Sequence, residues 1–173
     1  MLTDKLKSTL KGYLDFPKKG ILFQDISPVL LEPSLFNDLI RKMSEFDGFE
    51  RAECIVAIDA RGFIFGSAIS FLIKKPLIMA RKKHKLPGEL VTKQYGLEYG
   101  EDSLSLQEES LNKFNSFILV DDLLATGGTA KCIYEMLESK NKRIVGLSVF
   151  IELGSLLGRD KLPFDVSSQI KLD

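Results

Sequence analysis

FILVDDLLATGGTAKC (residues 117–132) passes from a run of apolar residues into two adjacent carboxylates, Asp121 and Asp122. A segment of glycines and hydroxyls, residues 126–129, comes next, and a helix-like pattern begins behind it. A short apolar run of this kind is typical of a strand that is buried on both faces of a parallel sheet. The stretch therefore predicts a strand, a polar loop and a helix in succession, with the polar groups at the carboxyl end of the strand.

The same alternation of strand and helix patterns extends over most of the chain. Strands are expected at residues 54–59, 76–81, 116–122, 143–153 and 165–172. Helices are expected at residues 61–73 and 127–139, at the N-terminus where Leu2, Leu6, Leu10 and Leu14 recur, and behind Ser34 with the apolar face Leu35, Phe36, Leu39, Ile40 and Met43. Ser34 is the predicted cap of that last helix.

Alternating strands and helices predict an α/β fold with a mainly parallel central sheet flanked by helices and right-handed crossovers. The 173 residues suit one domain. Ligands of such sheets bind beyond the carboxyl ends of the strands, so candidate sites follow Ile58, Ala80 and Val120. Two segments read as loops rather than regular elements. These are residues 15–30, which are rich in proline and glycine, and the long polar stretch 82–103, which a short expected strand, 104–107, follows.

Composition excludes several classes of protein. Lys plus Arg number 24 and Asp plus Glu number 24, so the basic excess of a general nucleic-acid binder is missing. Cys54 and Cys132 are far apart in apolar surroundings, which favours buried thiols in a reducing compartment over a zinc site. The longest apolar run, 62–73, is too short to span a bilayer, and no signal peptide is expected, so the predicted location is the cytoplasm.

The loop at residues 126–129 has the features of a phosphate cradle, because its glycines permit close approach and the next helix directs its N-terminus there. A tight Gly-Gly turn before a helix is the plain alternative. A single Asp would be read as a cap or a surface charge, but adjacent carboxylates repel each other and call for a ligand. The strand also resembles a Walker B strand, yet the chain has neither GxxxxGK[ST] nor GxGxxG.

An apolar strand, an acid pair, a small residue and TGGT together resemble the phosphoribosyl-pyrophosphate (PRPP) motif of type I phosphoribosyltransferases. The resemblance implies that Asp121 and Asp122 hold the ribose 2′- and 3′-hydroxyls. It also implies that the loop holds the 5′-phosphate through Ala125, Thr126, Gly127, Gly128 and Thr129. Carboxylates accept hydrogen bonds from a diol, and backbone N–H groups donate to a phosphate.

Further stretches resemble the adenine phosphoribosyltransferase family in particular. They are FPKKGILFQDISPVL, DARGFIFG with ARKKHKLPGE, YGLEYGEDSLSLQ and IELGSLLGRDKL, and they occur in that family's order over nearly the whole chain. The resemblance implies one domain, residues 1–173, with a small N-terminal hood of about residues 1–33 that recognises the base and a mobile lid of about residues 82–103. The implied reaction converts adenine and PRPP to AMP and pyrophosphate, with Mg²⁺ carried by PRPP and no metal cage of the protein's own.

The pyrophosphate of PRPP is expected at two basic segments. DARG resembles the family's pyrophosphate loop, which implies that Arg61 is a catalytic and PRPP-binding residue and that the Asp59–Ala60 peptide is cis. A lone arginine at a helix start could also be a surface residue, but the helix dipole disfavours a cation there unless an anion is near. Arg81, Lys82 and Lys85 would grip the pyrophosphate, in a run that would otherwise be read as a solvated loop.

The lid carries the predicted acid/base residue. Glu98 resembles the family's general acid/base and would take the proton from N7 as adenine N9 attacks the ribose, while the neighbouring Tyr99 would contact PRPP. A plain exposed glutamate in an acidic loop is the alternative reading for Glu98.

The base is expected in the hood. The resemblance implies that Phe23 stacks on the purine, that Leu22 and Gln24 offer backbone groups to its edge, and that Leu153 covers its other face. Many relatives carry Arg where this chain has Gln24. A core role for Phe23 is the alternative.

Other functions remain open at this point. A sister transferase for xanthine, hypoxanthine or guanine would share the PRPP motif, because base choice depends on few contacts. A PRPP-binding regulator of transcription would need a nucleic-acid surface, which a chain without basic excess does not predict. A purely structural module would leave the acid pair and the glycine loop without a reason. The expected partners are small molecules and, by resemblance, a second copy of the chain in a homodimer, with neither nucleic acid nor membrane.

Overall fold

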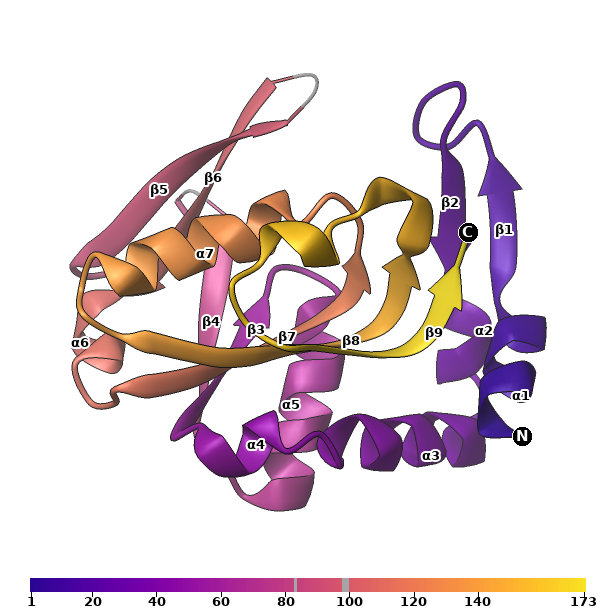
Figure 1. Ribbon diagram of the computed structural model, residues 1–173, viewed down its shortest axis with the longest axis horizontal. Coiled ribbons are helices and arrows are strands. Elements are labelled where there is room, and N and C mark those ends of the chain that lie inside the picture. The colour runs from indigo at the N-terminus through magenta and orange to yellow at the C-terminus, as the bar shows by residue number, and fades with distance from the viewer. Residues whose placement is uncertain (83, 98–99) are drawn as a thin grey trace.

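The computed structural model describes residues 1–82, 84–97 and 100–173. Its main sheet has the strand order β5 (Leu90–Leu97), β6 (Gly100–Gln107), β4 (Leu77–Lys82), β3 (Cys54–Ile58), β7 (Ser116–Leu124), β8 (Arg143–Leu153), β9 (Val166–Leu172). Strands β4, β3, β7, β8 and β9 are parallel, whereas β6 is antiparallel to both β4 and β5. The predicted α/β fold with a mainly parallel sheet is confirmed (Figure 1).

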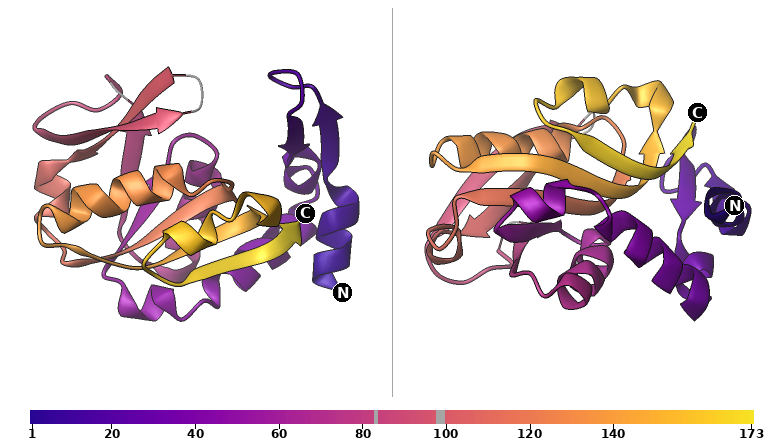
Figure 2. Two further views of the ribbon diagram at one scale, coloured as in Figure 1. Left: turned by 45° about the horizontal axis from the view of Figure 1, so that its top comes forward. Right: turned by 60° about the horizontal axis from the view of Figure 1, so that its bottom comes forward.

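Helices cover both faces of this sheet (Figure 2). The helices are α1 (Leu2–Thr9), α2 (Ser27–Leu30), α3 (Pro33–Ser44), α4 (Gly48–Arg51), α5 (Gly62–Ile73), α6 (Glu108–Leu111) and α7 (Gly128–Glu138), with the 3₁₀ turns η1 (Gly154–Leu156) and η2 (Arg159–Lys161). Helix α7 packs on one face, and α3, α4 and α5 lie on the other. Each face therefore has a hydrophobic core of its own.

The two connections that leave the centre of the sheet diverge. Strand β3 leads through α5 to β4 on one side, and β7 leads through α7 to β8 on the other, although β3 and β7 are neighbours. Right-handed crossovers that run in opposite directions place their helices on opposite faces, so a crevice opens between the carboxyl ends of β3 and β7. This topological switch point is where the polar residues of both loops meet.

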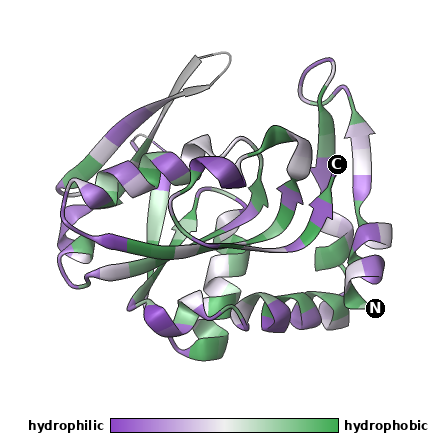
Figure 3. Ribbon diagram, in the orientation of Figure 1, coloured by the Kyte–Doolittle hydropathy of each residue, from purple (hydrophilic) through white to green (hydrophobic). Residues whose placement is uncertain are grey.

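Apolar residues explain why the central strands lie where they do. The first part of β7 is fully buried, as expected for an uninterrupted apolar run between two helical layers. Hydropathic colouring agrees with this, with mostly apolar residues along the central strands and along the whole of α5 (Figure 3). On the α5 side, Phe65 is buried between Phe36 of α3 and Phe150 of β8, at ring-centroid separations of 6.0 and 5.9 Å.

The N-terminal segment departs from its prediction. The helix ends at Thr9, and Leu14 lies exposed in a strand, β1 (Lys11–Leu14), that pairs antiparallel with β2 (Leu22–Asp25). Gly12 is a poor helix former, and the β1–β2 pairing satisfies the backbone groups that a longer helix would have satisfied. Residues 15–30 are thus not wholly irregular, because they contribute β2 and α2 as well as the loop that closes the hairpin.

The predicted lid is also more regular than its composition indicates. Strands β5 and β6 pair in register from Leu90 with Gln107 to Leu97 with Gly100, so much of residues 82–103 forms a hairpin. From Val91 to Tyr95, every second side chain of β5 faces α7: Val91 and Tyr95 pack against the hydrophobic core beneath α7, and Lys93 forms an ion pair with Glu135 at 3.1 Å. The alternation does not show in the sequence as an apolar pattern, because Lys93 and its neighbours are polar. Both hairpins extend beyond the carboxyl ends of β3, β7 and β8 (Figure 1).

The start of α3 differs from its prediction. Helix α3 begins at Pro33, and no side-chain hydrogen bond caps it at Glu32, so the prediction that Ser34 caps it is wrong. Proline starts the helix instead, because its fixed φ suits the first helical position and its missing N–H needs no partner there. Within the described ranges, no helix combines the length and the apolar character needed to cross a membrane.

Leu35 in α3 and Leu31, which lies between α2 and α3, provide a test of the α5-side core. Leu35 is 1% exposed and Leu31 is 81% exposed. We expect Leu35→Ala to lower the free energy of unfolding by about 2–5 kcal/mol, because it leaves a cavity beneath α3. Leu31→Ala, the matched control, should change it by no more than about 0.5 kcal/mol. Urea unfolding measures both variants, and equal effects would contradict this placement of α3.

Candidate functional site

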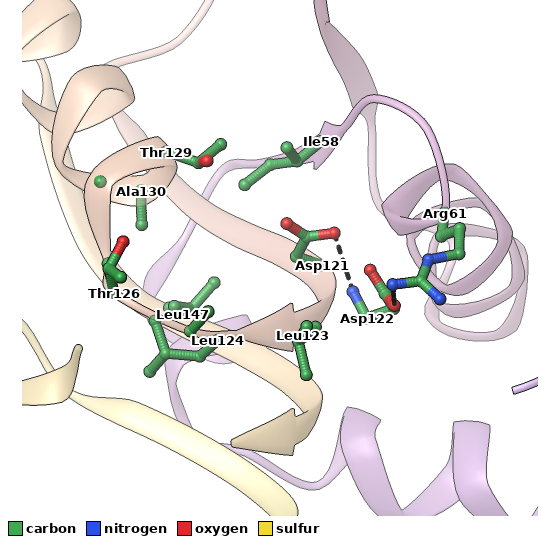
Figure 4. A pocket seen from close by; sticks show the side chains of 13 residues that line it. Ile58, Arg61, Asp121, Asp122, Leu123, Leu124, Thr126, Thr129, Ala130 and Leu147 are labelled. Carbon is green, nitrogen blue, oxygen red and sulfur yellow. Dashed lines mark hydrogen bonds and ion pairs between the residues drawn. The ribbon is translucent and has the colours of Figure 1, made fainter. Parts of the chain in front are cut away.

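The acid pair lies at the switch point, within β7 rather than at its end. The strand continues to Leu124, two residues beyond the predicted boundary at Asp122. The Asp122 side chain is buried, and the Asp122 N–H donates to Asp121 Oδ1 at 2.8 Å. Figure 4 shows the two carboxylates side by side at the mouth of the pocket. The β3–β7 pairing places them next to the loop that follows Ile58.

Helix α5 begins directly behind the acid pair, which requires a glycine. A Cβ atom on Gly62 would lie 2.9 Å from both Asp121 Oδ1 and the carbonyl oxygen of Val120. Any side chain at this position would push the helix off the strand. The close approach removes water from around Asp121.

Burial changes the proton affinity of both carboxylates. It raises the pKa of Asp121 well above its usual range, and the negative charge of Asp122 raises that pKa further. Burial also raises the pKa of Asp122, against the opposing effect of the Arg61 cation. Without a ligand that donates hydrogen bonds to them, the two ionised carboxylates therefore lower the stability of the fold.

The loop between β7 and α7 forms the other wall of the same pocket. This pocket has a volume of about 230 Å³, and its polar lining consists of Arg61, the acid pair and residues 125–129. Gly127 adopts a left-handed conformation, with φ +80°, and α7 begins at the next residue. The first N–H groups of a helix have no intrahelical acceptor, and the helix dipole favours an anion at that end. The structure thus brings together all seven predicted ribose and 5′-phosphate residues.

Arg61 connects this pocket to the hood. Its Nη2 lies 2.8 Å from Asp122 Oδ2. Its Nη1 donates to the Gln24 carbonyl oxygen at 3.2 Å, and its guanidinium lies 5.1 Å from the centroid of the Phe23 ring. Among the described residues, none donates a hydrogen bond to Asp122 Oδ2. Arg61 therefore interacts with that oxygen mainly through the attraction of opposite charges. A cation at the N-terminal end of a helix is unfavourable, and the carboxylate of Asp122 is the anion that offsets this effect for Arg61.

The hood presents an aromatic cavity beside Arg61. The cavity measures about 650 Å³ and is lined by Tyr13, Leu14, Asp15, Phe16, Phe23 and Asp25. Phe16 meets Phe23 edge to face at 5.1 Å between centroids, and Tyr13 is the cross-strand partner of Phe23. Sequence reasoning selected Phe23 but missed Tyr13 and Phe16. The pairing of β1 with β2 would have pointed to Tyr13, but no hairpin was expected, and Phe16 lies in the loop that follows β1, where no strand pattern marks it.

The remaining residues predicted to bind the base are less well supported by position. Leu22 is 53% exposed in the hood hairpin, and Gln24 contributes its carbonyl oxygen to Arg61. Leu153 packs against the core on the α5 side and is not among the described residues that line either cavity. Leu123 does line the 230 Å³ pocket, directly after the acid pair. It was overlooked because an apolar residue in a strand reads as core.

The basic segment that begins at the end of β4 approaches the loop after β3. Arg81 Nε lies 3.4 Å from Asp59 Oδ2, and Arg81 Nη1 donates to the carbonyl oxygen of Lys85 at 3.2 Å. The Lys82 N–H also donates to Asp59 Oδ2, at 3.4 Å. The Asp59–Ala60 peptide is cis, as the resemblance implied. The two predicted pyrophosphate segments therefore lie together at the carboxyl edge of the sheet.

Three residues of interest fall outside the described ranges: Lys83, and the predicted lid residues Glu98 and Tyr99. Within the described ranges, no group of three or more His, Cys, Asp or Glu side chains is placed to hold a metal ion.

The two cysteines are not activated as nucleophiles, because burial raises the pKa of Cys54 to about 12 and that of Cys132 to about 11.

The raised pKa of Asp121 generates a stability prediction. The folded chain holds this proton more tightly than the unfolded chain, so stability declines as the pH rises from the unfolded-state pKa through the folded-state pKa. We expect Asp121→Asn, whose amide oxygen can still accept the Asp122 N–H, to be more stable than the native chain at pH 7. A gain of about 1 kcal/mol would raise Tm by about 2–4 °C.

The stability gained by Asp121→Asn should vary with pH, and Asp122→Asn serves as its control. The gain should shrink as the pH falls and vanish at about pH 3, below the unfolded-state pKa, where Asp121 is protonated in both states. Asp122→Asn should gain less at pH 7, because it deprives Arg61 of its anion. Thermal melts across this pH range measure both variants. A Tm for Asp121→Asn below that of the native chain at pH 7 would contradict the burial of an ionised Asp121.

Comparison with known proteins gives a consistent result. The family model of the phosphoribosyl transferase domain matches residues 34–172. An adenine phosphoribosyltransferase of Prochlorococcus marinus (strain MIT 9215) is 56% identical over 171 residues, which cover 99% of each chain. An adenine phosphoribosyltransferase of Mycoplasmopsis pulmonis (strain UAB CTIP) is 43% identical over 168 residues, which cover 96% of this chain and 98% of the relative.

Solved structures agree with the sequence comparison. The adenine phosphoribosyltransferase of Thermoanaerobacter pseudethanolicus superimposes with a TM-score of 0.92 at 37% identity, covering 98% of this chain and 99% of that one. The enzyme of Saccharomyces cerevisiae, solved with adenine and an imino-altritol bisphosphate, gives a TM-score of 0.89 at 32% identity, covering 98% of each chain. The chain described here belongs to the adenine phosphoribosyltransferases, within the phosphoribosyl transferase domain family.

Proposed function

We propose that this enzyme transfers the ribose 5-phosphate group of PRPP to N9 of adenine, forming AMP and releasing pyrophosphate. The observation that supports it most directly is the single pocket in which the acid pair faces the loop of residues 125–129. One wall accepts hydrogen bonds and the other donates them. A ribose 5-phosphate has a diol at one end and a phosphate at the other, which is the matching arrangement.

The ribose is held by the acid pair in this proposal. The two hydroxyls of the diol donate to Asp121 and Asp122, and these bonds offset the cost of burying the carboxylates. The 5′-phosphate accepts from the backbone N–H groups and hydroxyls of residues 125–129 at the start of α7. Asp121→Asn, which should stabilise the fold, should therefore weaken PRPP binding, since the loss of one charge-assisted hydrogen bond costs about 1.5–3 kcal/mol.

The pyrophosphate is held by the cations at the edge of the sheet. Arg61, Arg81, Lys82 and Lys85 are assigned to it, the last three from the segment that already meets Asp59. Arg61 would exchange its contact with Asp122 for one with the ligand. The oxygen-rich acid pair and the pyrophosphate suit Mg²⁺, which when bound would neutralise charge on the leaving group.

The base is assigned to the hood. Adenine would stack on Phe23 in the aromatic cavity, with the backbone of Leu22 and Gln24 at its edge and Leu153 towards its other face. As N9 forms its bond to ribose C1, the bond from C1 to the pyrophosphate oxygen breaks, and Glu98 takes the proton from N7. The contact of Tyr99 with PRPP and the role of Glu98 remain predictions from family resemblance.

The proposal extends to the setting of the enzyme. By family resemblance we assign it to the cytoplasm and to a homodimer, and its ligands are the small molecules adenine, PRPP, AMP and pyrophosphate. Light scattering on the purified chain measures its mass against the 19.4 kDa of one copy.

A product assay tests the function itself. The enzyme is incubated with PRPP and Mg²⁺ and with adenine, hypoxanthine, guanine or xanthine in parallel. We expect AMP from adenine, no nucleotide from the three oxopurines, and loss of activity in EDTA that added Mg²⁺ restores. Turnover of an oxopurine would move the base assignment away from adenine. Binding of PRPP with no turnover of any base would favour a regulator instead.

The role of Glu98 has a separate test. Glu98→Gln should lower kcat by roughly 10²–10⁴-fold, because the proton on N7 loses its acceptor. The Kd for PRPP should stay unchanged, since the diol and phosphate contacts are elsewhere. Glu89→Gln is the control, because Glu89 is an exposed glutamate of the same segment. A Glu98→Gln enzyme with native kcat would remove Glu98 from the mechanism.

A further inference from the structure

The segment between β8 and β9 touches the back of the phosphate loop. We call residues 154–161, which include η1 and η2, the brace; it lies beside the start of α7 (Figure 1). A Cβ atom on Gly158 would overlap the carbonyl oxygen of Ala125 and would lie 2.9 Å from the backbone nitrogen of Gly127. A Cβ atom on Gly127 would lie 2.6 Å from the carbonyl oxygen of Gly158. The two backbones are thus in direct contact.

This contact falls at the residue on which the shape of the loop depends. Gly127 has φ +80° and immediately precedes the first residue of α7. Its backbone conformation directs the next N–H groups towards the pocket. A shift of Gly158 would therefore move the donors of the phosphate loop, although no residue of the brace lines the pocket within the described ranges.

The brace is itself fixed at the residue after Gly158. Arg159 forms a bidentate ion pair with Glu152 of β8, with Nε to Oε1 at 3.0 Å and Nη2 to Oε2 at 2.5 Å. Arg159 Nη1 donates to the carbonyl oxygen of Val166 at 2.5 Å, and Ser168 Oγ donates to Glu152 Oε2 at 2.7 Å. One guanidinium thus joins the brace to the ends of two strands.

The carboxylate of this pair has few alternatives to Arg159. Glu152 is 4% exposed, and its hydrogen bonds from Arg159 lower its pKa to about 2, so it stays ionised at physiological pH. A planar guanidinium matches a carboxylate at two points, which a lysine cannot reproduce. Loss of Arg159 would leave a buried charge unpaired and the brace without its fixed end.

We propose that Arg159 and Glu152 are positioning residues for the 5′-phosphate of PRPP, holding Gly158 against Ala125 and Gly127 so that the loop keeps its donors aimed at the pocket. The inference rests on the proposed phosphate-binding role of residues 125–129. Neither side chain touches substrate. The competing explanation is that the pair only joins β8 to β9 and supports the fold.

The two explanations differ in what a broken pair changes. A fold-only role lowers Tm without selecting one end of the substrate. A positioning role weakens phosphate binding and leaves the stacking of the base in the hood intact, because the hood is built from different strands. We expect Arg159→Gln and Glu152→Gln to weaken ribose 5-phosphate binding, measured by calorimetry well below Tm, by about tenfold or more. The KM for PRPP should rise correspondingly, and the KM for adenine should not.

Further variants make the test independent of folding. Arg159→Lys keeps the charge without the fork and should bind ribose 5-phosphate with intermediate affinity. Gly158→Ala keeps the ion pair but places a methyl against Ala125, and it should show the same defect. Ile170→Ala removes buried side-chain atoms from β9, so it should lower stability as the ion-pair variants do without breaking the Arg159–Glu152 pair. Arg51→Gln removes an arginine of similar exposure (44% against 42%), which pairs with Asp165 just before β9. Both controls should bind ribose 5-phosphate like the native enzyme.

Thr129→Val separates failure of this inference from failure of the proposed site. It removes a hydroxyl of the phosphate loop itself and should weaken ribose 5-phosphate binding directly. If Thr129→Val weakens binding while Arg159→Gln, Glu152→Gln and Gly158→Ala bind normally, the positioning role is overturned. If all four variants bind normally, residues 125–129 are not the phosphate site, and the proposed function loses its main support.

Discussion

The Arg61 guanidinium holds together parts of the molecule that are far apart in sequence. It lies 2.8 Å from Asp122 Oδ2 in β7, donates to the Gln24 carbonyl oxygen in β2 at 3.2 Å, and lies over the ring of Phe23. A guanidinium suits this task because it offers several donors in a plane and also a face for aromatic contact. The hood thus meets the sheet at the point where the two carboxylates need a compensating charge.

That need arises from the topology. The connections after β3 and β7 leave in opposite directions, so the crevice between the two strands cannot be filled by either loop. Gly62 lets α5 close on one side of this crevice, and the left-handed Gly127 lets α7 begin on the other. Carboxylates buried between them have raised pKa values and gain from a ligand that donates hydrogen bonds. The cost to the fold and the affinity for a diol have the same physical origin.

The brace shows a second level of the same arrangement. Backbone donors bind an anion well only when they are held in place before it arrives, because ordering them on binding would cost affinity. The loop of residues 125–129 is short and includes two glycines, so its own sequence does not order it. Contact with Gly158 and the Arg159–Glu152 ion pair supply the order from outside the pocket.

The sequence by itself determined the central strands, the helices that cross over between them and the acid pair with its loop. Each of these signals is local: an uninterrupted apolar run, a helical period, or glycines beside carboxylates. The resemblance to known transferases added the cis peptide at Asp59–Ala60, which no local pattern indicates.

Tertiary structure decided the rest, because the deciding contacts join residues far apart in the chain. The β1–β2 and β5–β6 hairpins were expected as helix end or loop, since their alternating residues are few and largely polar and become meaningful only against α7 or Arg61. The partner of Arg61, the position of Leu123 in the pocket and the contact of Gly158 with Gly127 leave no mark in the local pattern. Only folding brings their backbones and charges within reach of one another.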